Sequence, residues 1–351
     1  MLTSMPGGKK IKIGIDIGTN AIKIACYSTK KKFKNEAQLL KYDYFVEDEI
    51  SDVRDVNETN IVNGLKDLLS GLPFKRASIN VGVSTDFQNI FFLQLPQMAS
   101  HEIKQALFWE LAPLLAKPVE NFEYDFSLLP QTEKKKVNIL LAVVEKSRIE
   151  WIQKVFKSLS GGINLLETTT LPTVDLFHTL HAKNDSTVGI LHLGGSNSHY
   201  TILDSNQYPE FLYIPFGGNL LNQIIAKSAD IPGREVEMLR RGMLENSSNG
   251  QPLHTLYMQN KALEKQLKNL SMTIRKHNFR HFYHTGERVT NIYVTGGLVN
   301  DSFIKAFIEH SEKIMEVPAE TWDPAKHYFP DLPIDDSNAF QFSTAIGLAL
   351  R

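Results

Sequence analysis

Apolar and polar residues alternate in two similar stretches of the chain. Residues 12–27 read KIGIDIGTNAIKIACY, and residues 188–203 read VGILHLGGSNSHYTIL. In each stretch two alternating runs flank a short turn rich in glycine and small polar residues, which predicts a β-hairpin with one face toward the core. Because both halves of the chain begin with the same hairpin pattern, we expect two domains of common architecture.

Further strands and helices are predicted in both halves. Period-two or continuous apolar runs predict strands, and apolar residues spaced three and four apart predict helices. The strands are expected at 77–85, 90–96, 122–130, 136–144 and 291–295, and the helices at 59–70, from 100, 146–158, 171–182 and at the C-terminal end. This is an α/β pattern with a cleft between the halves. We place the first domain at 1–187, with an inserted subdomain at about 86–160. The second domain is placed at 188–351, and its C-terminal helix could return to the first.

Charge and composition exclude several classes of function. The chain has 38 basic and 39 acidic residues, so it lacks the positive field that recruits nucleic acid. Cys26 is the only cysteine, which excludes an intramolecular disulfide. The start, MLTSMPGGKK, lacks the apolar run of a signal peptide, and no apolar run is long enough to cross a bilayer. We therefore expect a soluble, cytoplasmic protein.

The turns of the two hairpins suit a phosphate group. Glycine leaves backbone N–H groups accessible, hydroxyl and amide side chains add donors, and lysine adds charge. The candidate phosphate ligands are Gly18, Thr19, Asn20 and Lys23 in the first hairpin and Gly194, Gly195 and Ser196 in the second. Asp16, at the end of the first strand, could hold Mg²⁺ directly or through water. The second hairpin has His192 at the matching position.

The order of these motifs resembles the actin-like ATPase superfamily, and within it the PilM family of type IV pilus assembly proteins. The resemblance rests on IGIDIGTNAIKIA, VGILHLGGSNSHYTILD and NIYVTGGLVND. It extends over LQLPQMASHEIKQALFWELAPLLAKPVENFEYDFSLL, YIPFGGNLLNQIIAKSADIPGREVEMLRRG and AIGLALR. It implies a two-domain actin-like ATPase fold with an inserted subdomain of the FtsA/PilM type and a nucleotide cleft between the domains.

The resemblance also implies ATP and Mg²⁺ as cofactors. The two hairpins would clamp the phosphates, and the adenosine would lie beside Glu237, Arg240, Gly296, Gly297 and Leu298. His192 departs from the aspartate common in the family, and a neutral imidazole is a poor partner for hydrated Mg²⁺. The one candidate general base is Glu167, which could equally be a solvated side chain. We therefore expect weak or regulatory ATP binding with slow turnover at most.

Two further clusters have structural and functional interpretations. His277, His281 and His284 lie on one predicted helical stripe that is too long for a shared metal ion, which favours a polar or partner-facing surface. Four aromatic residues of the inserted subdomain could form its core or line a groove for a partner peptide; they are Phe91, Phe92, Phe108 and Trp109.

Two functions compete. By resemblance to PilM, the chain would be a scaffold at the cytoplasmic side of the inner membrane that binds the cytoplasmic tail of a PilN-like membrane protein. Contacts with motor components and self-association are further expectations. The alternative is a catalytically active actin-fold ATPase or small-molecule kinase, but no convincing catalytic carboxylate is present. An FtsA-like division protein is a nearer rival, and the ending AIGLALR, which leaves no room for an amphipathic membrane helix, favours PilM.

Overall fold

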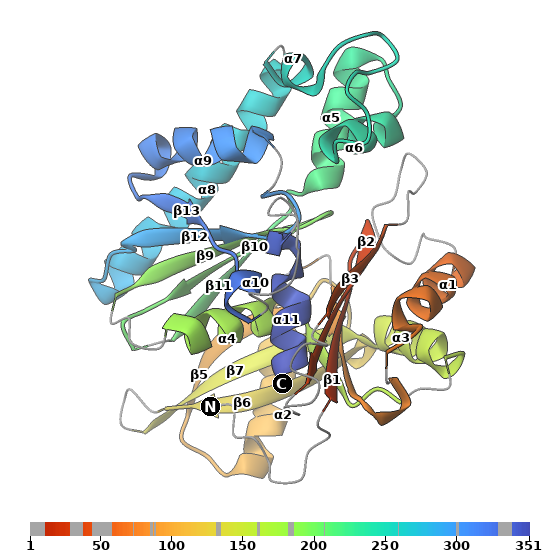
Figure 1. The fold of residues 1–351 in the computed structure, drawn as a ribbon. Coiled ribbons are helices and arrows are strands. Elements are labelled where there is room, and N and C mark those ends of the chain that lie inside the picture. Colours follow the sequence, from red (N-terminus) through yellow and green to blue (C-terminus); the bar gives the residue numbers. More distant parts are fainter. Residues whose placement is uncertain are drawn as a thin grey trace.

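Three β-sheets form the framework of the protein (Figure 1). The computed structural model describes residues 11–28, 38–43, 58–72, 74–84, 87, 89–130, 135–159, 162–181, 186–206, 208–258, 260–299, 302–328 and 339–351. Two sheets have five strands and the third has three, and helices pack around them. The fold is α/β, as the pattern of residues predicts.

The first sheet has the order β3-β2-β1-β4-β8, with β1 antiparallel to β2 and parallel to β4. Its strands are β1 (Ile11–Ile17), β2 (Ala21–Ser28), β3 (Gln38–Asp43), β4 (Ser78–Val83) and β8 (Leu165–Thr168). The helices α1 (Glu58–Leu69) and α3 (Lys146–Lys157) share a core with this sheet. The helices α4 (Thr170–His181) and α11 (Ser343–Leu350) pack together, and α11 lies against β1, β2 and β4.

The second sheet repeats this topology in the order β11-β10-β9-β12-β13. Its strands are β9 (Val188–Leu193), β10 (Ser198–Leu203), β11 (Pro209–Ile214), β12 (Asn291–Thr295) and β13 (Ala319–Thr321). Four helices stand between β11 and β12, namely α5 (Gly218–Ala229), α6 (Gly233–Arg240), α7 (Leu253–Met258) and α8 (Lys261–Thr285). The helices α9 (Ser302–Met315) and α10 (Ala325–Tyr328) follow β12 and β13. The equivalent strand orders explain why the two halves open with the same sequence pattern.

An inserted subdomain stands between β4 and β8. Its sheet has the order β5-β7-β6, made of β5 (Ile90–Pro96), β6 (Phe122–Leu129) and β7 (Lys136–Glu145). The helix α2 (Ser100–Leu111) covers one face and closes a separate apolar core, which includes Ile103, Leu107 and Leu141. The Glu102 carboxylate accepts a hydrogen bond from the Ala99 backbone N–H (2.7 Å), which stabilises the start of α2.

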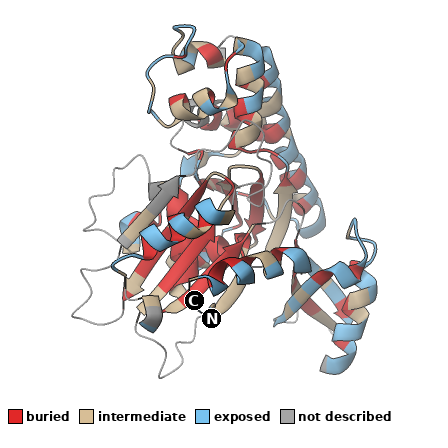
Figure 2. Cartoon of the chain, turned by 90° about the vertical axis from the view of Figure 1, so that its right-hand side faces the viewer, coloured by how far each residue is buried: buried red, intermediate tan, exposed pale blue. Residues whose placement is uncertain are grey.

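The C-terminal helix α11 packs tightly on the first sheet (Figure 1). A Cβ atom at Gly14 would lie 2.1 Å from the backbone oxygen of Ala345, so only glycine permits this approach. The Asn80 amide also donates to the Leu348 carbonyl (2.8 Å). In Figure 2 the buried residues gather on the strands of the sheets and on the inner sides of the helices.

The inserted subdomain also contacts the second domain. The Phe92 and Tyr208 rings meet edge to face with their centroids 6.0 Å apart. The Tyr208 hydroxyl donates to the Pro130 carbonyl (2.6 Å). In the described part of the chain no helix has the length and apolar character needed to cross a membrane.

Candidate nucleotide site and partner groove

The turns of the two hairpins meet between the domains. The hydroxyl oxygens of Thr19 and Ser196 are 2.6 Å apart, and the Asn20 amide donates to the Asn219 side-chain oxygen (2.9 Å). The backbone N–H of Asn219 in turn donates to the carbonyl of Gly195 (2.8 Å). The candidate phosphate ligands of both hairpins are thus brought together, and a phosphate between them would have to separate the Thr19 and Ser196 hydroxyls.

The candidate metal ligand Asp16 is buried and forms an ion pair. Its Oδ2 accepts from the Lys23 Nζ at 2.6 Å, across the β1–β2 register that pairs these two residues. No group of three or more metal-binding side chains gathers anywhere among the described residues. Since Mg²⁺ prefers several oxygen ligands, a cation beside this one carboxylate would need further ligands from the nucleotide and water.

His192 lies in β9 directly across from His199 in β10. Burial lowers the pKa of His192 to about 4, although the nearby Asp16 carboxylate opposes the shift. Burial lowers the pKa of His199 to about 3, with a further contribution from His192. Both imidazoles are therefore neutral at pH 7, and His192 supplies no negative charge toward Asp16 and Lys23.

The candidate adenosine ligands converge at the start of α5. The Arg240 guanidinium donates to the Gly218 carbonyl (3.1 Å) and the Asn222 side-chain oxygen (2.8 Å), and it pairs with Glu237 (3.2 Å). A Cβ atom at Gly218 would lie 3.1 Å from a terminal carbon of Leu298, so the turn after β12 reaches the same place.

The charges of this group are mutually satisfied. Burial alone would raise the pKa of Glu237, but Arg240, Arg241 and a hydrogen bond from Asn222 outweigh it and lower the pKa to about 2. Glu237 therefore stays ionised and holds the guanidinium of Arg240 in place.

The two glycines after β12 have different surroundings. Gly296 has φ +105° and lies against β9, where a Cβ atom would come 2.4 Å from the Leu193 carbonyl oxygen. A Cβ atom at Gly297 would meet nothing within 4 Å. Gly296 is thus required by packing, whereas Gly297 leaves room for close approach of a flat ligand.

Glu167 is engaged in an ion pair. Its two carboxylate oxygens accept from Arg351 at 2.8 and 2.5 Å, and the same guanidinium also bonds Asp175. Burial raises the pKa of Glu167, and the charge of Arg351 opposes this shift. Neither the general-base nor the solvated interpretation of Glu167 included the ion pair with Arg351. A carboxylate that accepts two hydrogen bonds from a guanidinium is poorly placed to accept a proton from water.

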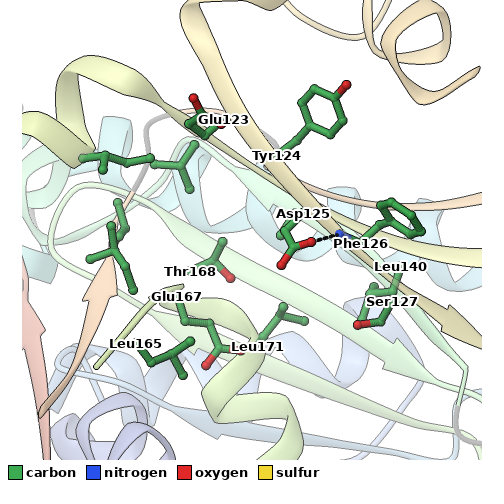
Figure 3. Close-up of a pocket in the computed structure, with 15 residues that line it drawn as sticks. Glu123, Tyr124, Asp125, Phe126, Ser127, Leu140, Leu165, Glu167, Thr168 and Leu171 are labelled. Atoms are coloured by element: carbon green, nitrogen blue, oxygen red, sulfur yellow. Dashed lines mark hydrogen bonds between the residues drawn. The ribbon is translucent and has the colours of Figure 1, made fainter. Parts of the chain in front are cut away.

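A groove of about 400 Å³ lies between the inserted subdomain and the end of the first sheet (Figure 3). One wall is the sheet face not covered by α2, where β7 presents Leu140, Ala142 and Val144 and β6 presents Glu123 and Asp125. The opposite wall comes from β8 and α4, with Leu165, Leu166, Glu167, Thr168 and Leu171. The groove is thus apolar at its base and acidic at its rim.

The groove is bordered by two edge strands. Among the described strands, β6 is the outer strand of the inserted sheet and β8 is the outer strand of the first sheet. An outer strand has backbone N–H and C=O groups that an added strand can pair. An extended peptide can therefore gain main-chain hydrogen bonds here, with its side chains on the apolar base.

A family model described as type IV pilus assembly protein PilM matches residues 14–351. The chain belongs to the PilM family. A solved structure described as a PilM-PilN type IV pilus biogenesis complex is similar in fold, with a TM-score of 0.76, 16% identity, and coverage of 97% of this chain and 98% of that chain. No curated protein sequence matches the chain significantly.

Two further solved structures share the fold of this PilM family member. One is the ethanolamine utilization protein EutJ from Carboxydothermus hydrogenoformans, with a TM-score of 0.54, 12% identity, and coverage of 100% of this chain and 91% of that chain. The other is a diol dehydratase-reactivating factor in nucleotide-free form, with a TM-score of 0.52, 8% identity, and coverage of 97% and 99%. The predicted actin-like fold is confirmed.

The structure corrects the prediction for the histidine stripe and decides between the two interpretations of the aromatic residues. His277 and His281 are buried and face Glu210, so the polar-surface prediction is wrong for them and holds in the structure only for the exposed His284. Of the four aromatic residues expected to form the core of the inserted subdomain or line a groove, Phe91 and Phe108 pack against that core, and none lines this groove. Phe92 packs on Tyr208 instead.

Apart from Glu167, the residues that line the groove were missed. The signal for them was present in β7, where VNILLAVV (137–144) is apolar on both faces of a strand. Ile139, Leu141 and Val143 are buried toward α2, which leaves Leu140 and Ala142 on the open face. A strand that is apolar on both sides, in a sheet with one covering helix, indicates a second packing partner.

Proposed function

We propose that this PilM family member is a scaffold of the inner-membrane assembly complex of a type IV pilus or related secretion system. It acts at the cytoplasmic side of the membrane, where it binds the cytoplasmic tail of a PilN-like protein. The observation that carries this proposal is the groove between the inserted subdomain and β8. Family membership and the fold shared with the PilM-PilN complex support the same partner.

The chemistry of the groove defines the tail it would accept. An extended segment with alternating apolar residues would place them on Leu140, Ala142 and Leu165 while its backbone pairs with β6 or β8. Glu123 and Asp125 at the rim favour a tail with basic residues on either side of the apolar segment.

ATP binding is proposed as weak and regulatory. The hairpins retain the glycines and donors for phosphate, and Gly297 leaves room beside the second sheet. The Thr19–Ser196 contact would have to open, however, and Lys23 would have to divide its interaction between Asp16 and a phosphate. Inserting a ligand between two contacting hairpins would move the two domains apart, so we expect bound nucleotide to change the angle between them. We do not expect rapid hydrolysis.

The test is isothermal titration calorimetry of the full chain with a synthetic peptide of the PilN-like tail, with and without ATP. We expect one-to-one binding in both conditions, with an affinity that changes when ATP is present. Absence of binding in both conditions would refute the scaffold proposal. Phosphorylation of a small molecule at ordinary enzymatic rates would favour the kinase alternative.

A further inference from the structure

One side of α8 carries a stripe of exposed lysines and aromatic rings, with the half-buried Met272 between them. Successive members are three or four residues apart, so all lie along one face of the helix. The stripe consists of Lys261, Lys265, Lys268, Met272, Lys276, Phe279 and Tyr283. At 1.5 Å per residue it is about 33 Å long.

The opposite side of α8 fixes this orientation. Leu263, Leu270 and Ile274 are buried in the core of the second domain. Asn260 caps the helix by accepting from the backbone N–H groups of Ala262 and Leu263, each at 3.1 Å. The stripe is therefore displayed by a helix that is already folded and anchored, so its lysines and rings need no folding step to bind a ligand.

The charge of α8 differs sharply from that of the chain. The whole chain is nearly balanced, with 38 basic and 39 acidic residues, whereas α8 contains six basic residues and one acidic residue. The two arginines beside the stripe are paired, Arg275 with Glu316 (2.5 Å) and Arg280 with Glu210 (3.0 Å). Within the described residues, the four lysines of the stripe have no ion-pair partner.

The aromatic end of the stripe is unusually exposed. The Phe279 side chain is 68% exposed and Tyr283 is 77% exposed, one helical turn apart. Large apolar rings next to lysines are the combination that binds the interface of a bilayer, where rings enter the headgroup region and ammonium groups meet phosphates.

We propose that this stripe is a membrane-contact surface that binds anionic phospholipid headgroups. A straight row of lysines and rings about 33 Å long matches a flat surface, and the lysines complement the negative potential of an anionic leaflet. The contact is separate from the tail-binding groove, so it goes beyond the proposed function. It would hold the chain against the bilayer beside its membrane-spanning partner.

The test is co-sedimentation of the full chain with vesicles of equal parts phosphatidylglycerol and phosphatidylcholine, and with vesicles of phosphatidylcholine alone. The test variant is Lys265→Glu/Lys268→Glu/Lys276→Glu. The matched control is Lys66→Glu/Lys104→Glu/Lys157→Glu, which changes the net charge equally at exposed positions outside α8. A second variant, Phe279→Ser/Tyr283→Ser, removes the rings. Circular dichroism of each variant is the check that it is folded.

We expect binding to the anionic vesicles alone, weakened by salt. Each stripe lysine lost should lower the partition coefficient about fivefold, since a lysine near an anionic surface contributes about 1 kcal/mol. The control should lose less, and the ring variant should bind more weakly without losing salt dependence. Absence of wild-type binding, or equal losses in the test and control variants, would overturn the proposal. The proposal would also be overturned if the stripe bound only an acidic protein or a second copy of the chain.

Discussion

The hydroxyl oxygens of Thr19 and Ser196, which are 177 positions apart in the sequence, lie 2.6 Å apart where the two domains meet. Each hydroxyl belongs to a hairpin turn that carries candidate phosphate ligands. In this arrangement the two turns bond to each other, so the domains are connected at the candidate nucleotide site.

This contact should contribute to stability as a pair. In a double-mutant cycle of Thr19→Val and Ser196→Ala, we expect a coupling free energy of about 0.5–1.5 kcal/mol in denaturant unfolding. Thr19→Val combined with Ser70→Ala, at an exposed turn position, is the control and should show additive effects. Zero coupling in the first cycle would mean that the hairpins are apart in solution.

His192→Asp should tighten the binding of Mg-ATP. The substitution places a second carboxylate near Asp16, and an added oxygen ligand should raise Mg-ATP affinity about tenfold. ATP measured in excess chelator should gain nothing, because two neighbouring carboxylates repel the phosphates when no cation is present. Fluorescent-nucleotide titration measures both values. Equal Mg-ATP affinity in His192→Asp and the parent would show that this hairpin does not meet the metal.

Glu167→Gln should destabilise the chain and leave ATP turnover unchanged. The amide cannot replace the charged bonds from Arg351, so we expect a loss of about 1.5–3 kcal/mol in the free energy of unfolding. Glu245→Gln at an exposed position is the control and should change little. A fall of tenfold or more in the ATP hydrolysis rate of a folded Glu167→Gln protein would instead identify Glu167 as the general base.

Stability should fall as the pH is lowered from about 6.5 toward 4. Burial lowers the pKa of three histidines below the ordinary 6.5, to about 4 for His192, about 3 for His199 and about 4 for His277. In this range the unfolded chain binds protons that the folded chain does not, and each histidine contributes a slope of up to about 1.4 kcal/mol per pH unit.

The pH dependence is measured by denaturant unfolding at a series of pH values. His277→Gln should flatten the slope by about one proton, whereas His101→Gln at an exposed position should leave it unchanged. A parent protein with the same stability at pH 6.5 and pH 4.5 would contradict the assignment. Below this range the loss should continue, because protonation of Glu210, whose pKa is lowered to about 2, weakens its bonds to His281 and Arg280.

Many of the helices and strands could be predicted from the sequence because local periodicity of apolar residues determines them. The alternating residues of β1 and β9 predicted both hairpins, and their common topology accounts for the similarity. The apolar spacing of 59–70 and 146–158 predicted α1 and α3 to within one residue at each end.

Contacts between distant residues could not be predicted in this way. The bond of Glu167 to Arg351 spans 184 positions, and periodicity carries no information about such a pair. For α8, a helical stripe of histidines was apparent, but which side of the helix faces Glu210 depends on where β11 lies. The groove likewise arises from two edge strands that only the folded chain brings close.

The measurement that tests the scaffold account most directly is calorimetric titration of the PilN-like tail peptide into Ala142→Trp and Ala112→Trp. The first substitution fills the base of the groove, and the second adds the same ring at an exposed position beyond α2. We predict that Ala142→Trp lowers the peptide affinity at least about tenfold, since it displaces an apolar segment, while Ala112→Trp binds like the parent. Equal affinity in all three proteins, or no binding by the parent, would contradict the account.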